Sequence, residues 1–256
     1  MFVFPTPSKE VLEKIYEEDY FSNKGKSEFG YTDYDKDKEP MRLVFELYLD
    51  KLSRLTPGRN IFDVGAATGY FLDIAKKDGW HTFGSEISTY GKEEGEHRGH
   101  TMYLGSLRDV SCDTKMDVIT MWDVLEHVDD PIAYVRDAKE LLGSKGIIAI
   151  NTVDASSLWA RIMGMKWHLI VPPEHLNYFS RESLVRLLEA EGFEILEIKK
   201  IGKSFSLPYI LKTLASWQGL AIWTTLAQWT SRTYLRHISL PINLFDNMFV
   251  IAKKRS

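Results

Sequence analysis

Short apolar runs alternate with amphipathic stretches from about residue 60 onward. The apolar runs are typical of buried strands and occupy Ile61–Val64, His81–Ser85, Thr101–Leu104, Met116–Met121 and Gly146–Asn151. The stretches between them have helical spacing, most clearly at Gly69–Lys77 and Pro131–Leu142, where Pro131 suits a first helical turn. Strands that alternate with helices in this way indicate a parallel sheet with helices covering its faces.

The pattern changes after residue 180. Ser180–Glu191 has leucines at helical spacing between a serine cap and Gly192, and it predicts a helix. Phe193–Lys200 and Asn247–Ala252 read as two more strands, which we expect to pair at the sheet edge. The residues between them, 203–246, are too many for a loop and predict a mostly helical insertion.

Composition narrows the class of protein. The chain has 256 residues, enough for one full core with attachments, and a formal net charge of -4. Its longest basic cluster, residues 253–255, is too short to bind nucleic acid by charge. A single cysteine, Cys112, excludes an internal disulfide and a cysteine-based zinc site. The N-terminus MFVFPTPSKE lacks the features of a signal peptide, so we expect a cytoplasmic protein.

The most informative stretch is IFDVGAATGYF, residues 61–71. It joins the first predicted strand to the first helix, which is where ligands bind in open α/β sheets. Gly65 and Gly69 permit unusual φ angles, and Ala66, Ala67 and Thr68 between them are small. The turn therefore predicts a binding site for a small ligand, in which the backbone of the turn lies close to the ligand.

The spacing of this turn argues against a dinucleotide. Ala67 stands where a G-x-G-x-x-G fingerprint has its middle glycine, and Asp63 would repel a pyrophosphate but attract an amine or a cation. Glu86 ends the second strand in FGSEIS, where a carboxylate can accept bonds from both hydroxyls of a ribose. A ribose without a pyrophosphate is the ligand that these residues favour. Asp63 and Glu86 also allow a simpler interpretation, as strand-end acids that bond loop amides.

Three stretches, DVGAATGYF, GSEIS and MDVITMWDVLEHVDDP, together resemble the class I S-adenosylmethionine-dependent methyltransferases. The resemblance implies that S-adenosylmethionine is the cofactor and S-adenosylhomocysteine the product. It implies that Asp63, Gly65 and the neighbouring backbone hold the methionine part, and that Glu86 binds the ribose. The full set of implied cofactor-binding residues is Asp63, Gly65, Ala66, Ala67, Thr68, Gly69, Phe71, Glu86, Ile87, Gly105, Ser106, Leu107, Trp122, Asp123 and His127.

Two positions depart from the family pattern. The family has Cys-Gly or a similar pair at Ala66 and Ala67, and often an acid at Ser106. Because a left-handed backbone is costly for alanine, we expect a negative φ at Ala67. The stretches EEDYFSNKGKSEFGYTDYD and WHLIVPPEHLNYFSRESLVRLLEAEGF resemble a bacterial branch that includes ubiquinone-type O-methyltransferases and methyltransferases encoded beside surface-polysaccharide genes.

Candidates for catalysis lie in two segments. His168, His175 and Tyr178 belong to WHLIVPPEHLNYF, which we interpret as a flap over the site, and His127 follows the fourth strand in EHVDDP. Methyl transfer to a hydroxyl needs in-line positioning and a base, and a histidine suits that base. The alternatives are that the flap is a structural loop and that His127 caps the next helix. No set of His and carboxylate residues has metal-ligand spacing, so we expect no metal.

The insertion and the N-terminal arm each allow two interpretations. Trp217, Trp223 and Trp229 recur every six positions in a stretch without charged residues, Thr213–Ser231. This stretch is too polar to predict a transmembrane span, and two readings stay open. One is a helix pair packed on the core or on a second subunit; the other is a contact with a membrane surface. The early aromatics form either a lid over the cofactor or an anchor for the N-terminal arm; they are Tyr16, Tyr20, Phe21, Tyr31 and Tyr34.

The sequence thus predicts one α/β domain with a Rossmann-like, doubly wound, mostly parallel sheet of seven strands whose last strand is antiparallel. Residues 1–55 are assigned to an arm or lid, 56–202 to the core and flap, 203–246 to the insertion and 247–256 to the last strand. The predicted function is methyl transfer to a small-molecule acceptor, sugar- or lipid-linked acceptors included, by a monomer or homodimer. Oxygen is the favoured acceptor atom, and nitrogen and carbon are the alternatives. The rivals are a non-catalytic cofactor- or partner-binding module with the same fold and, less favoured, a nicotinamide-dependent oxidoreductase.

Overall fold

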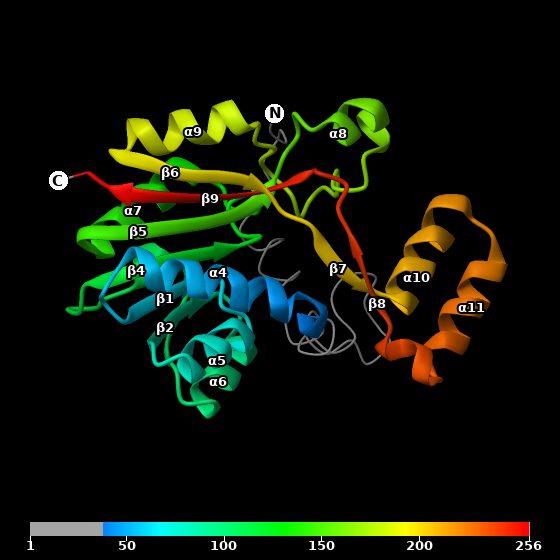
Figure 1. The fold of residues 1–256 in the computed structure, drawn as a ribbon, viewed down its shortest axis with the longest axis horizontal. Helices are drawn as coiled ribbons and strands as arrows, with labels where there is room; N and C mark the ends of the chain where they lie inside the picture. The colour runs from blue at the N-terminus through cyan, green and yellow to red at the C-terminus, as the bar shows by residue number, and fades with distance from the viewer. Residues whose placement is uncertain (1–37, 256) are drawn as a thin grey trace.

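The computed structural model describes residues 38–255, except for eleven side chains between residues 203 and 242. Its centre is a seven-stranded sheet in the order β3-β2-β1-β4-β5-β9-β6 (Figure 1). Strands β1 to β5 run parallel, and β9 runs antiparallel to both of its neighbours. The predicted fold class is therefore confirmed, including the antiparallel last strand.

The strands of this sheet are β1 Asn60–Val64, β2 His81–Glu86, β3 Thr101–Leu104, β4 Met116–Trp122, β5 Leu142–Val153, β6 Phe193–Lys200 and β9 Asn247–Lys254. The helices of the core are α4 Arg42–Leu55, α5 Tyr70–Lys77, α6 Thr89–His97, α7 Pro131–Leu141, α8 Leu158–Met163 and α9 Arg181–Ala190. Short 3-10 turns occupy η1 Glu39–Met41, η2 Leu107–Asp109 and η3 Gly164–Lys166.

Both faces of the sheet are covered by helices because side chains alternate along each strand. Ile61 of β1 faces a buried cluster that includes residues of α4 and α5, whereas the next residue, Phe62, faces one that includes residues of α7 and α9. Each helix contributes one apolar stripe to this packing, such as Leu184 and Leu188 of α9. The helices cover the two faces of the sheet, and the loops lie at the ends of the strands.

Several predicted elements differ in extent. Strand β5 begins at Leu142, directly after α7, and is therefore longer than the predicted Gly146–Asn151. Helix α4 lies in the predicted arm, but Phe45, Leu49 and Leu52 are buried against the sheet, so this part of the arm belongs to the core. The proposed aromatic lid, Tyr16 to Tyr34, lies outside the described residues.

The chain between β6 and β9 stands apart from the sheet. It contains a two-stranded antiparallel ribbon, β7 Lys203–Ser206 with β8 Ser239–Ile242, which the sequence did not predict. The ribbon carries α10 Leu207–Gln218, α11 Ala221–Ser231 and the turn η4 Tyr234–His237 to one side of the molecule (Figure 1). Within residues 38–255, no helix is long and apolar enough to cross a membrane.

Candidate active site

The parallel strands end together at one edge of the sheet. Val64 of β1 is in register with Ser85 of β2 and with Met121 of β4, and Trp122 of β4 pairs with Asn151 of β5. The residues that follow these strand ends therefore converge on one region, although they are far apart in sequence. This is the edge at which open α/β sheets bind ligands.

The loop after β1 is a tight turn with three left-handed residues. Gly65 has a φ of 66°, Ala67 of 51° and Gly69 of 85°. The expectation of a negative φ at Ala67 is wrong, and its conformation costs on the order of 1–2 kcal/mol for a residue with a Cβ. The turn tolerates this cost because the Ala67 N–H donates a 2.9 Å hydrogen bond to a Glu86 carboxylate oxygen.

Glu86 is the residue that joins the loops after β1 and β2. Its side chain is buried, at 5% exposed, and one oxygen accepts from Ala67 while the other accepts from the Ser88 N–H at 3.0 Å. Burial raises the Glu86 pKa, and the backbone hydrogen bonds oppose that rise. Glu86 therefore orders the loop amides, and each carboxylate oxygen keeps a second lone pair for a ribose hydroxyl.

Asp63 is the second buried acid at this edge. Its Oδ1 accepts a 2.6 Å hydrogen bond from the Thr120 hydroxyl of β4. The Asp63 pKa is raised to about 7, chiefly by burial and also by the nearby Glu86 charge, and the Thr120 hydrogen bond and Lys38 oppose the rise. A carboxyl group with this pKa gains its charge most easily beside a cationic ligand, which fits the amine and sulfonium of the implied cofactor.

The residues that the resemblance assigns to the adenine combine one exposed apolar side chain with ordered backbone. Ile87 follows Glu86 and is 46% exposed, an apolar surface that a flat ring would cover. The Gly105 N–H donates to the Glu86 carbonyl, and the Ser106 N–H and hydroxyl both donate to Asp109. Phe71 and Leu107, which are also assigned to the cofactor, are buried members of the two core clusters.

Trp122 and Asp123 lie at the end of β4. The Trp122 ring packs among Phe45, Phe71 and Phe249, with ring centroids 4.7 to 5.4 Å away. Its buried indole N–H has no hydrogen-bond partner in the described part of the chain. Asp123 has a φ of 55° and accepts a hydrogen bond from the Asn151 side chain.

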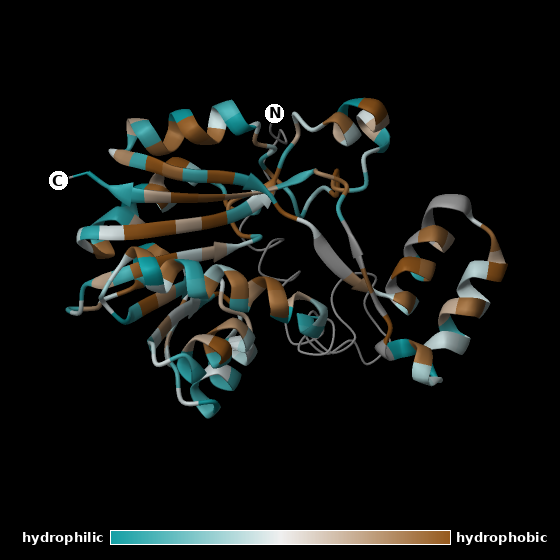
Figure 2. Cartoon of the chain, viewed as in Figure 1, coloured by the Kyte–Doolittle hydropathy of each residue, from teal (hydrophilic) through white to brown (hydrophobic). Residues whose placement is uncertain are grey.

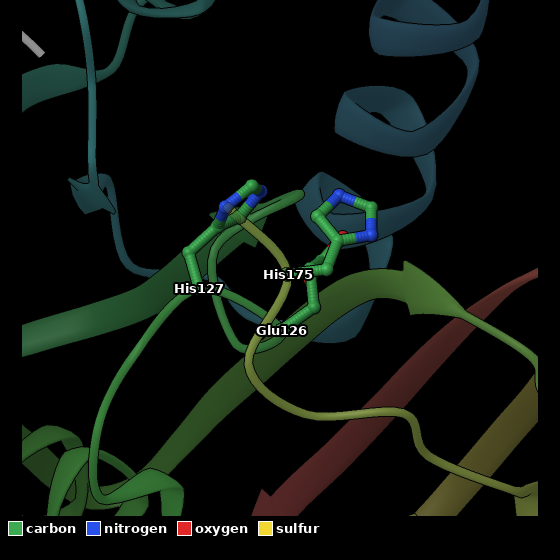
Figure 3. Close-up of side chains that lie close together, drawn as sticks. All are labelled: Glu126, His127 and His175. Carbon is green, nitrogen blue, oxygen red and sulfur yellow. The ribbon is translucent and has the colours of Figure 1, made fainter. Parts of the chain in front are cut away.

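Two of the predicted catalytic residues meet beside this edge. His127, from the loop after β4, and His175, from the flap, have ring centroids 4.6 Å apart at 84°. Glu126 lies next to them, and one ligand atom from each of the three lies within 4.8 Å of the others (Figure 3). We call Glu126, His127 and His175 the Glu-His-His cluster.

Backbone contacts fix both imidazole rings. His127 Nδ1 lies 2.9 Å from the Glu174 carbonyl and His175 Nδ1 lies 2.8 Å from the Leu169 carbonyl. Since a carbonyl only accepts, both Nδ1 atoms carry a proton, and in a neutral ring the Nε2 atom then has the lone pair. Such a pair of rings can accept a proton or bind a metal ion.

Burial and neighbouring charges shift the pKa values of two members of the cluster. Burial, and then the His127 charge, lowers the His175 pKa to about 4, so this ring is neutral near pH 7. Burial and the nearby Asp123 charge raise the Glu126 pKa, while His175 and a 2.8 Å hydrogen bond from the Thr152 hydroxyl oppose the rise. A proton accepted by His175 would be stabilised by an ionised Glu126.

The other two catalytic candidates lie elsewhere in the flap. His168 has its Nε2 3.7 Å from a carboxylate oxygen of Asp246, which also accepts from the Trp167 indole at 2.9 Å. Tyr178 is buried in a cluster with Val153, Ala160 and Trp167, and its ring centroid is 6.3 Å from that of His175. Both residues therefore support the flap, and neither belongs to the Glu-His-His cluster.

Several residues of the site were not predicted from the sequence. Glu126 was quoted only as a neighbour of His127, and Thr120 and Ser88 only as parts of strands and motifs. Gly91 of α6 is close to the loop, since a Cβ there would lie 2.9 Å from Glu86 Cγ and 3.0 Å from the Ala67 carbonyl oxygen. The sequence signal for this contact is a glycine at position 91, in the first turn of the helix that follows Glu86.

Sequence comparisons agree with this geometry. A family model described as a methyltransferase domain matches residues 39–198, more than half of the chain. The ubiquinone biosynthesis O-methyltransferase of Actinobacillus pleuropneumoniae is 25% identical over 160 residues, covering 56% of this chain and 68% of that protein. The protein of the same name from Aeromonas salmonicida is 22% identical over 220 residues, covering 74% and 91%.

Solved structures share the fold. Magnesium protoporphyrin IX methyltransferase from Synechocystis, with bound S-adenosylhomocysteine, matches with a TM-score of 0.59 at 13% identity, over 96% of this chain and 100% of that one. A methyltransferase from Archaeoglobus fulgidus matches with a TM-score of 0.56 at 18% identity, over 83% and 94%. The family match and the acid-lined turn lead to one conclusion. The chain belongs to the methyltransferase-domain family and is a class I S-adenosylmethionine-dependent methyltransferase.

Proposed function

We propose that this methyltransferase acts on an oxygen atom of a small hydroxyl-bearing acceptor and that the Glu-His-His cluster removes the hydroxyl proton. The observation that carries the proposal is the pair of imidazoles with both Nδ1 protons fixed by carbonyls. When bound, S-adenosylmethionine supplies a methyl group on a positively charged sulfur. The protein must then align the acceptor and take up one proton.

The cofactor side of the site is assigned to the residues that end β1 and β2. Glu86 would hold the ribose hydroxyls and Asp63 the cationic methionine part, with the turn of residues 65–69 between them. Ile87 and the backbone of residues 105–106 would flank the adenine. Phe71 and Leu107 would act from the core, by holding the loops in place.

The acceptor side is assigned to the loop after β4 and to the flap. His175 is neutral near pH 7, so its Nε2 lone pair is ready to accept a proton without first losing one. His127 lies against it and would share contact with the acceptor. Glu126 would stabilise the imidazolium that forms, as a neighbouring carboxylate does for a catalytic histidine.

The names of the curated relatives support oxygen as the atom that is methylated, since both are called O-methyltransferases. Histidines suit this task because a hydroxyl must lose its proton, whereas a neutral amine can attack before losing one. We expect the transfer to need no metal, although three ligand atoms within 4.8 Å of one another would also suit a cation. A sugar- or lipid-linked acceptor fits the same chemistry.

The test uses purified full-length protein, radiolabelled S-adenosylmethionine and a panel of catechols, simple phenols, sugars and primary amines. We expect label to enter hydroxyl-bearing compounds, and the rate to fall in His175→Ala but not in His97→Ala, which replaces an exposed histidine. Label in amines alone would contradict the proposal. A chelator should leave the rate unchanged; loss of activity that a divalent cation restores would make the cluster a metal site.

A further inference from the structure

The segment from residue 199 to residue 245 has a different charge from the rest of the chain. It holds six Lys or Arg residues and no Asp or Glu. The chain has 32 basic and 36 acidic residues, so the remainder holds 26 and 36, a net charge of -10 against +6 for the segment. The six cations are Lys199, Lys200, Lys203, Lys212, Arg232 and Arg236.

Helix α11 of this segment leaves much of its surface exposed. One stripe of α11 is shielded, and its members recur at helical spacing: Trp223, Leu226, Ala227 and Thr230. The rest of α11 is exposed, including Ile222 at 61% and Trp229 at 56%. Figure 2 shows α10 and α11 mostly brown and white, with little teal, in agreement with a stretch that has few charges.

The exposed apolar residues of α11 share one side of the helix with a cation. Ile222, Thr225, Trp229 and Arg232 are spaced i, i+3, i+7 and i+10, which places them along one stripe. Beyond the helix, Tyr234 is 93% exposed, and more exposed apolar side chains follow at Ile238, Leu240 and Phe245. Tryptophan, tyrosine and aliphatic residues flanked by cations are typical of surfaces that bind at membrane interfaces.

We propose that α10, α11 and the residues to Phe245 bind the surface of an anionic lipid bilayer. The charge of the segment is complementary to such a surface, and the negative remainder of the protein would face away from it. Helices of 12 and 11 residues are too short to span a bilayer, so the contact is peripheral. The proposal does not depend on the proposed methyl transfer, because binding is measured without turnover.

The test is cosedimentation of the full-length protein with vesicles of phosphatidylcholine alone and of phosphatidylcholine with phosphatidylglycerol. We expect binding only to the second kind, weakening as salt rises. The double variant Lys212→Glu, Arg232→Glu should bind at least about tenfold more weakly. The matched control Lys77→Glu, Lys145→Glu reverses two exposed cations outside the segment and should bind as the unmodified protein does.

A second variant separates the apolar contribution. Ile222→Ser with Trp229→Ser should also weaken binding, because both side chains lie on the exposed stripe. Circular dichroism and thermal melting check that every variant is folded. Equal binding to both vesicle types, or binding unchanged by the charge reversals, would overturn the proposal. A monomeric protein that binds neither kind of vesicle would also overturn the proposal. If light scattering shows a dimer that Trp229→Ser dissociates, this face is a subunit contact and the proposal is likewise overturned.

Discussion

The turn of residues 65–69 and the Glu-His-His cluster lie at the same edge of the sheet but are assembled differently. Glu86, which is only 19 residues from Ala67, accepts one hydrogen bond from the Ala67 amide of the turn and one from the Ser88 amide of the loop after β2. The cluster joins His127 to His175 across 48 positions, and its side chains contact two backbone carbonyls and the Thr152 hydroxyl.

This difference matches the two tasks proposed for the site, which are cofactor binding at the turn and proton transfer at the Glu-His-His cluster. A cofactor seat must present charge in fixed places, and buried carboxylates tied to backbone amides do so in a rigid way. A proton acceptor must stay neutral until the acceptor arrives, and burial keeps His175 in that state. Changes on the cofactor side should therefore alter affinity, whereas changes in the cluster should alter turnover.

The largest effect is expected in the cluster. His175→Ala should lower kcat by about 10²- to 10⁴-fold, the range for loss of a general base, with the Kd of S-adenosylmethionine unchanged. Turnover and calorimetry on the same preparation measure both, with His97→Ala as control. An equal loss in cofactor affinity would show that the two sides are not separate.

The next effect is expected at Glu86. In Glu86→Gln the side-chain amide would face a loop N–H, so one of the two backbone hydrogen bonds is lost along with the charge. We expect the Kd of S-adenosylmethionine to rise by about 100-fold. A hydrogen bond from a ribose hydroxyl to a charged carboxylate contributes about 1.5–3 kcal/mol, and its loss corresponds to a change of this size. Glu93→Gln, at an exposed position on α6, is the control and should not change the Kd.

A smaller effect is expected from pH. Because the Asp63 pKa is about 7, this carboxyl is mostly protonated at pH 6 and mostly ionised at pH 8. Affinity for the cationic cofactor should therefore rise by up to about tenfold over this interval, as the ionised fraction does. Calorimetry at both pH values should find the rise missing in Asp63→Asn and kept in Asp50→Asn.

The same pKa has the opposite consequence for stability. A raised carboxyl pKa means that the folded state binds the Asp63 proton more tightly than the unfolded state does. The contribution of Asp63 to the free energy of unfolding is fully present below about pH 4 and is lost as pH rises through about 7. Without the cofactor, Asp63→Asn should remove this part of the pH dependence of unfolding, and an unchanged dependence would place its origin elsewhere.

The smallest effect is expected at Ala67. Glycine has no penalty at a φ of 51°, so Ala67→Gly should raise the free energy of unfolding by about 0.5–1 kcal/mol, a few degrees in Tm. Ala133→Gly, within α7, should instead lower it by about 1 kcal/mol. A loss of stability in Ala67→Gly would mean that the turn does not hold its left-handed form in solution.

Much of the fold could be predicted because its signals are local. The strands between residues 60 and 151 and the helices α5 and α7 follow from the apolar pattern, and the acids at positions 63 and 86 follow from their places at strand ends. The pairing of β6 with β9 also followed from pattern, since both runs are strand-like. The ribbon of β7 and β8 was missed because four-residue strands beside helices leave no periodic signal.

The sequence by itself determined the sheet, the position of the first turn and the identity of the acids near it, because these depend on residues within a few positions of one another. Only the tertiary structure decided that Ala67 is left-handed, held by a hydrogen bond from outside the turn. It also decided that His175 meets Glu126 and His127, whereas His168 faces Asp246. These contacts depend on how the flap crosses the sheet edge, and the packing of the whole chain, not any short stretch, sets that path.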